Sequence, residues 1–144
     1  MFKRITVAYN ETPEAERALL SAIQLAKILS AELRTITVMA NLPAYTAFAA
    51  AGDPSLPQTL EDDRLKFYQG LQEKACVLAE SQGVEVLSHI VDGLQVETII
   101  HHLREYKADL LVLGLHHRNL YMARLWSTAY ELAQESPCSV LGVH

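Results

Sequence analysis

The chain has 144 residues, half of them apolar and a fifth charged, which fits one globular domain with its own core. Its 12 basic and 17 acidic residues give a formal net charge of −5, which argues against nucleic-acid binding. No run approaches the roughly 18 apolar residues that span a membrane, and the N-terminus lacks a signal-peptide pattern. We expect a single domain over residues 1–144, with neither nucleic-acid nor membrane partners.

The two cysteines, Cys76 and Cys138, form no metal-binding or redox motif. Their apolar sequence neighbours predict that both are small buried residues. A reducing cytoplasm is the simplest setting for such a chain.

The first third of the chain predicts a strand, a helix and a second strand. Residues 5–9 are a short apolar run, and residues 31–40 are rich in β-branched side chains. Between them, Thr12 can cap a helix and Pro13 suits its first position. The apolar stripe of that helix comprises Ala15, Ala18, Leu19, Ala22, Ala26 and Leu29.

Residues 41–58 carry three prolines and a glycine, which predicts a long loop. Helical spacing returns over residues 60–82, and Gly83 is placed to end that helix. The side expected to face inward consists of Leu60, Phe67, Leu71, Ala75 and Leu78.

The rest of the chain continues the alternation. Strands are predicted over residues 84–91, 110–113 and 139–143, and a helix over residues 92–109. A last helix ends before Pro137, with Met122, Leu125, Trp126, Ala129, Leu132 and Ala133 at helical spacing. Alternating strands and helices predict an α/β fold with a parallel sheet covered on both faces. Ligands bind such sheets beyond the carboxyl ends of the strands, an edge that here carries Asn10, Met39 and Gly114.

Several segments resemble the universal stress protein family over essentially the whole chain. They are KRITVAYNETPEAERAL, VDGLQVETII, ADLLVLGLHHRN and STAYELAQESPCSVLGV. The resemblance implies a single doubly wound domain with a five-stranded, mainly parallel sheet. This fold is Rossmann-like, of the adenine-nucleotide alpha-hydrolase type. The resemblance also implies a homodimer.

The resemblance implies that family members that bind ATP have a sequence pattern similar to G-x2-G-x9-G-[ST] after the fourth strand. It also implies that they have an aspartate after the first strand. Here Gly114 and Thr128 match that pattern, whereas His117 and Ser127 replace the two later glycines and Asn10 replaces the aspartate. The segment is more similar to the UspA type, which is not expected to bind ATP.

Physical reasoning about the replaced positions agrees with a degenerate nucleotide-binding motif. Glycine lets the backbone approach a phosphate closely, and the side chains of His117 and Ser127 add bulk there. Arg118 and Thr128 at a helix N-terminus still offer an anion site. The candidate ligand-binding residues are therefore Asn10, Met39, Gly114, His116, His117, Arg118, Ser127 and Thr128.

Catalytic and metal sites are not expected. His101 and His102 are neighbours on a helix and off its apolar stripe, which predicts that both are solvated. His116 and His117 lack a third ligand at zinc-like spacing, and no nucleophile is paired with a base. We expect no resident cofactor and no enzymatic activity.

The last strand has no proline and no charged residue from 139 to 143, and it is expected at a sheet edge. Two copies could pair there through Val140, Leu141 and Val143, as the resemblance also implies. The favoured hypothesis is a cytoplasmic, non-enzymatic, dimeric stress-response module that acts through regulatory protein partners. The alternatives are an ATP- or AMP-binding switch of the same fold, or an enzyme of the wider adenine-nucleotide group.

Overall fold

The computed structural model describes residues 1–39, 52, 54–116 and 128–144. One parallel sheet forms its centre, in the order β3-β2-β1-β4-β5. The strands are β1 (Arg4–Ala8), β2 (Glu32–Met39), β3 (Val86–Asp92), β4 (Leu110–Gly114) and β5 (Ser139–Val143). All four neighbouring pairs run parallel, so the α/β fold with a five-stranded, doubly wound sheet is confirmed.

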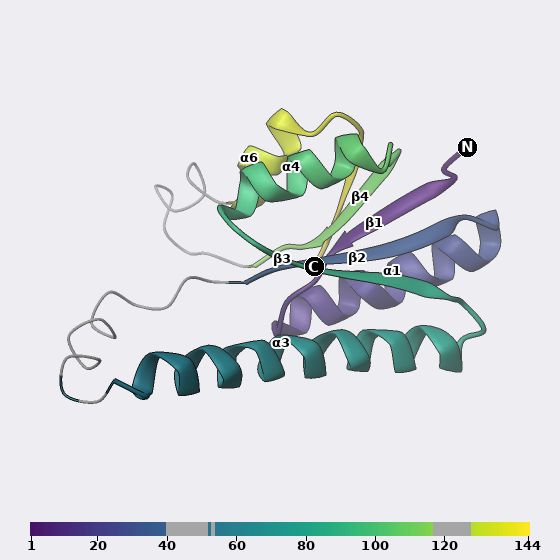
Figure 1. Cartoon of the computed structure of the whole chain (residues 1–144). Helices are drawn as coiled ribbons and strands as arrows, with labels where there is room; N and C mark the ends of the chain where they lie inside the picture. Colours follow the sequence, from purple (N-terminus) through teal and green to yellow (C-terminus); the bar gives the residue numbers. More distant parts are fainter. Residues whose placement is uncertain (40–51, 53, 117–127) are drawn as a thin grey trace.

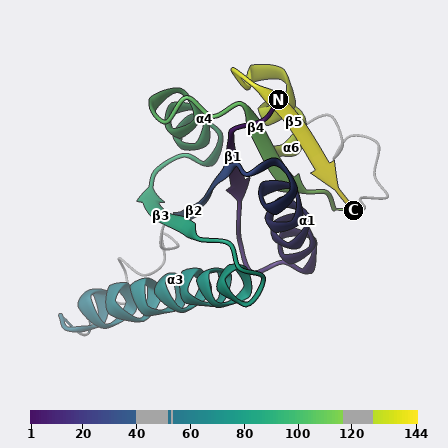
Figure 2. The same cartoon turned by 90° about the vertical axis from the view of Figure 1, so that its right-hand side faces the viewer.

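Four described helices cover the two faces of this sheet. Helices α1 (Pro13–Leu29) and α3 (Leu56–Ser81) lie on one face, and α4 (Gln95–Glu105) and α6 (Thr128–Glu135) lie on the other (Figure 1). Figure 2 shows β5 at one edge of the sheet and β3 at the opposite edge. None of the helices that the structure describes is long and apolar enough to cross a membrane.

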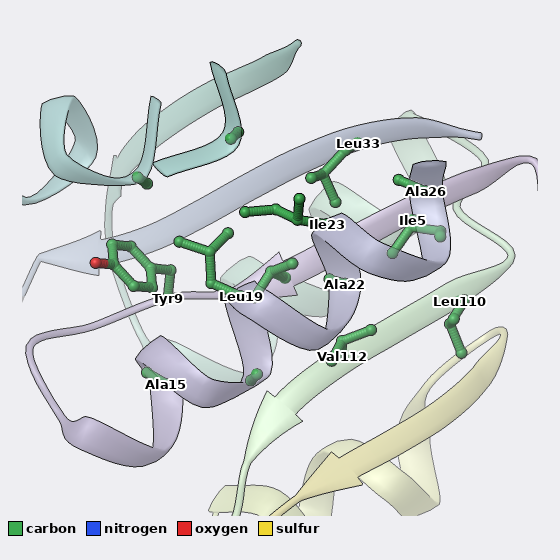
Figure 3. Packing of buried hydrophobic residues seen from close by; sticks show 14 residues of the cluster. Ile5, Tyr9, Ala15, Leu19, Ala22, Ile23, Ala26, Leu33, Leu110 and Val112 are labelled. Carbon is green, nitrogen blue, oxygen red and sulfur yellow. The ribbon is translucent and has the colours of Figure 1, made fainter. Parts of the chain in front are cut away.

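Helix α1 forms the centre of the larger apolar cluster. The Thr12 hydroxyl accepts a hydrogen bond from the Ala15 N–H at 3.2 Å, so the predicted N-cap is confirmed. Small and branched residues alternate on the buried side of α1 and let it lie close to the strands. Figure 3 shows Leu19, Ala22 and Ile23 of α1 against Leu33 of β2 and Val112 of β4.

Helix α3 differs from its prediction at both its start and its buried side. It begins at Leu56, so residues 56–58 form its first turn; proline is tolerated there because those N–H groups have no helical partner. Within the predicted loop, residues 41–51 and 53 lie outside the described residues. Phe67, which was predicted to face inward, is 52 % exposed. The N-terminal part of α3 extends beyond the sheet (Figure 1). Gln72, Ala75 and Ala79 are the buried residues of α3.

Polar residues tie α3 to β2 inside the fold. The Thr35 hydroxyl donates to Gln72 Oε1 at 2.7 Å, and Gln72 Nε2 donates to the hydroxyl of Thr37. Thr37 in turn donates to the Tyr9 carbonyl at 2.8 Å. These hydrogen bonds satisfy groups that would be costly to bury without partners.

Two further expectations, on the start of α4 and on the burial of the cysteines, need correction. Helix α4 begins at Gln95 rather than at residue 92, because Gly93 adopts a positive φ of 145° and Leu94 has an extended backbone.

The two cysteines are free but only partly buried. Cys76 Sγ lies 3.2 Å from Ser88 Oγ, and Cys138 Sγ lies 3.4 Å from Ser136 Oγ, so neither sits in a wholly apolar site.

Candidate ligand crevice

The sheet has its switch point between β1 and β4. The chain leaves β1 toward α1 on one face, and after β4 it reaches α6 on the other face. A cavity of about 280 Å³ lies at the carboxyl ends of these two strands. Its walls include Ala8 of β1, Leu113 and Gly114 of β4, and Leu132 of α6. The cavity is therefore where the order of elements predicted a ligand.

Asn10 and Thr12 form a polar turn on the α1 side of the crevice. Asn10 Oδ1 accepts hydrogen bonds from the Thr12 N–H at 3.0 Å and from the Thr12 hydroxyl at 2.6 Å. Because Thr12 also accepts from Ala15, this turn serves to start α1. The Asn10 carboxamide oxygen is therefore already engaged, and its amide nitrogen is the group left to face a ligand.

Gly114 has a packing role in addition to its place in the crevice. A Cβ at this position would lie 2.5 Å from the backbone carbon of Glu14 and 2.7 Å from the Ala15 nitrogen. Real Cβ atoms essentially never approach other atoms that closely. The first turn of α1 thus requires glycine here, whether or not a phosphate binds.

His116 and Glu14 form a pair at the mouth of the crevice. His116 Nδ1 lies 3.2 Å from Glu14 Oε2, and His116 lines the cavity. The backbone N–H of Glu14 lowers the pKa of its carboxyl below the ordinary value, and the charges of His116 and Arg17 act in the same direction. The carboxylate is therefore ionised at neutral pH and places a negative charge beside the crevice.

Helices α4 and α6 supply the opposite wall. Gln95, the first residue of α4, and Thr128, the first described residue of α6, both line the cavity. Gln95 was missed by sequence reasoning; the only available signal was its place at a helix start after Gly93. Thr12 was recognised as a helix cap but not as a crevice residue.

The predicted ligand residues divide into three groups. Asn10, Gly114, His116 and Thr128 come together at the cavity. Met39 ends β2 beside Asp92 of β3 and is not part of the lining. His117, Arg118 and Ser127 lie outside the described residues.

The structure also bears on metal binding, which was not expected, and on the candidate dimer edge. Within the described parts of the chain, no group of three His, Cys, Asp or Glu side chains could hold a metal ion. The candidate dimer residues Val140, Leu141 and Val143 lie on β5, which does form a sheet edge as expected. Leu141 is 37 % exposed.

The chain is similar to known proteins in both sequence and fold. The family model described as "Universal stress protein family" matches residues 1–144 of the chain. "Universal stress protein C" of Salmonella typhimurium is 26 % identical over 140 residues, covering 97 % of this chain and 94 % of that protein. The solved "Universal stress protein UspA from Lactobacillus plantarum" is similar with a TM-score of 0.74 and 21 % identity, covering 99 % of this chain and 98 % of that one. A structure described as "universal stress protein in complex with cAMP" has a TM-score of 0.74 and 23 % identity, covering 99 % and 97 %.

Proposed function

This chain belongs to the universal stress protein family, and we propose that it is a member without enzymatic activity and without tight ATP binding. In this proposal it acts as a cytoplasmic homodimer that regulates partner proteins in the stress response. The observation that argues against tight ATP binding, the part of the proposal that the crevice addresses, is the ionised Glu14 carboxylate paired with His116 at its mouth.

A triphosphate is strongly anionic and needs unpaired positive groups or free N–H groups around it. Among the described lining residues, the group able to become cationic is His116, and it is already held by Glu14. Asn10 stands where ATP-binding members are expected to have an aspartate, and its oxygen is committed to Thr12. The cavity of about 280 Å³ is also at the lower limit of typical ligand pockets, roughly 300–1,000 Å³.

Thermal unfolding with millimolar ATP and magnesium tests the proposal. We expect no rise in Tm and no ATP turnover above a blank. A ligand at a hundred times its Kd would stabilise the fold by about 2.7 kcal/mol, so tight binding would be obvious.

Glu14→Gln removes the negative charge at the mouth of the crevice and should strengthen any residual ATP binding. Glu85→Gln, at the residue immediately before β3, is the charge-matched control. A clear ATP-dependent rise in the Tm of the wild-type protein would overturn the proposal.

A second candidate is a switch that binds a nucleoside monophosphate. It is favoured by the similar fold whose description names a complex with cAMP, and by the neutral polar groups of Asn10, Gln95 and Thr128 on the cavity wall. Denaturing the purified protein and assaying the supernatant for released nucleotide distinguishes the two. A stoichiometric nucleotide would favour the switch.

The dimer is proposed to form through β5. This edge strand leaves N–H and C=O groups available for antiparallel pairing about a twofold axis. We expect Leu141→Lys to lower the mass in solution to that of a monomer, because like charges would meet near the axis. Leu87→Lys is the matched control, since Leu87 lies on the opposite edge strand β3 and is similarly exposed, at 40 %. A dimer that survives Leu141→Lys, or a wild-type monomer at micromolar concentration, contradicts this interface.

A further inference from the structure

His102 of α4 is buried, which corrects the expectation that both neighbouring histidines are solvated. Only 4 % of His102 is exposed, whereas the side chain of His101 is largely in solvent. Within the described part of the chain, His102 Nε2 is buried without a hydrogen-bond partner. A buried polar atom without a partner is uncommon and costs free energy, so its presence needs an explanation.

The surroundings of His102 are aromatic and basic. Its ring centroid lies 5.0 Å from that of His89 on β3 and 4.5 Å from that of Tyr106. The guanidinium of Arg34 on β2 lies 4.2 Å from the centre of the Tyr106 ring, and its Nη1 is 3.3 Å from His89 Nε2. We call His89, His102, Tyr106 and Arg34 the imidazole cluster. It joins three elements: β2, β3 and the end of α4.

The charges around the cluster oppose proton uptake. Burial, followed by the charges of His89, Arg34 and His101, lowers the pKa of His102 from 6.5 to about 4. Burial and Arg34 also lower the pKa of His89, and only the exposed Glu105 acts in the other direction. Glu32, the nearest carboxylate to Arg34, is already paired with it at 2.5 Å. Among the described residues, a proton on the cluster would therefore meet mainly like charge, and the one opposing carboxylate, Glu105, is exposed and lies 3.6 Å from His101.

The other elements around α4 are mainly apolar where they meet it. Strand β4 contributes Leu111 and Leu113 to the same cluster as Ile99 and Leu103 of α4, and α6 contributes Leu132. The ionisable groups of α6 are Tyr130, Glu131 and Glu135, of which Tyr130 and Glu135 are exposed and Glu131 is partly buried. A protonated His102 would thus be solvated only if α4 moved away from the sheet.

We propose that the imidazole cluster makes the packing of α4 on the sheet acid-sensitive, so that protonation of the cluster releases α4 and the crevice wall it carries. The start of α4 favours such a motion. Gly93 has a positive φ of 145° and Leu94 provides no side-chain cap, so α4 is held mainly by its apolar face. Gln95, the first residue of α4, lines the crevice and would move with the helix. This inference concerns the fold itself and does not depend on what the crevice binds.

Hydrogen exchange of the unmodified protein at about pH 7 and about pH 5 tests the release directly. After correction for the intrinsic pH dependence of exchange, amides of α4 should lose more protection at the lower pH than amides of α1. Helix α1 is the internal reference because it packs on the other face of the sheet. Equal changes in the two helices would overturn the proposal.

Denaturant unfolding of variants tests the role of His102. For a group with a pKa of about 4 when folded and 6.5 when unfolded, the unfolding equilibrium constant rises about 20-fold from pH 7 to pH 5. His102→Gln should remove most of this factor, and His101→Gln, an exposed neighbour with the same substitution, should retain it. His89→Gln should reduce the factor in part, and it serves as the second variant if His102→Gln does not fold. A His102→Gln or His89→Gln variant with the wild-type pH dependence would refute the assignment.

Discussion

Substitution of Gly114 by alanine separates two explanations for this glycine. In the glycine pattern that this sequence partly matches, the glycine would serve a phosphate, whereas the structure places its Cα against the first turn of α1. A Cβ would sit 2.5 Å from the Glu14 carbonyl carbon, and ordinary van der Waals contact begins at 3.4 Å. The backbone of β4 or of α1 must therefore separate by roughly 1 Å.

The cost of that separation can be placed on the usual scale for overpacked sites, about 1–3 kcal/mol. Both partners resist movement. Strand β4 is paired with β1 on one side and with β5 on the other, and α1 is buried along Ala15, Ala18 and Leu19. For a chain of this length, each kcal/mol lowers Tm by about 4 °C. We expect Gly114→Ala to lower Tm by about 4–12 °C in the absence of any ligand.

Calorimetry or circular dichroism on Gly114→Ala and Gly70→Ala provides the measurement and its control. A Cβ at Gly70, inside α3, would meet nothing within 4 Å. Alanine is favoured over glycine in a helix interior by about 1 kcal/mol, so Gly70→Ala should leave Tm unchanged or higher. If Gly114→Ala keeps the wild-type Tm and changes only ligand binding, the packing explanation is wrong.

Two further predictions concern hydrogen bonds that hold helices α3 and α1 in place. Gln72→Leu should destabilise the protein by about 1–3 kcal/mol, because the buried hydroxyls of Thr35 and Thr37 lose their amide partner; an unchanged denaturant midpoint would contradict this. Thr12→Ala should cost about 1 kcal/mol through loss of the α1 cap, whereas Thr59→Ala, whose hydroxyl is exposed, should stay within about 0.5 kcal/mol. Equal losses in the two threonine variants would show that the cap is not the cause.

Local signals in the sequence were sufficient for the order of elements and for several of their ends. Thr12 and Pro13 mark the start of α1 because capping depends on neighbouring residues alone. Gly83, with a φ of 76°, follows the end of α3 for the same reason. The alternation of strands and helices, together with the short apolar runs, determined the parallel sheet and the edge position of β5.

Only the tertiary structure decided which side chains meet across the sheet. His102 appeared solvated from its helical position, yet α4 turns it toward His89 on β3 and Arg34 on β2. The helical pattern could not show this, because the partners lie on strands far away in the sequence. Likewise, Gly114 matched a phosphate pattern, but its contact with Glu14 arises from packing between β4 and α1. Periodicity reports which face of an element is apolar; close approach and charge pairing depend on where the neighbouring elements lie.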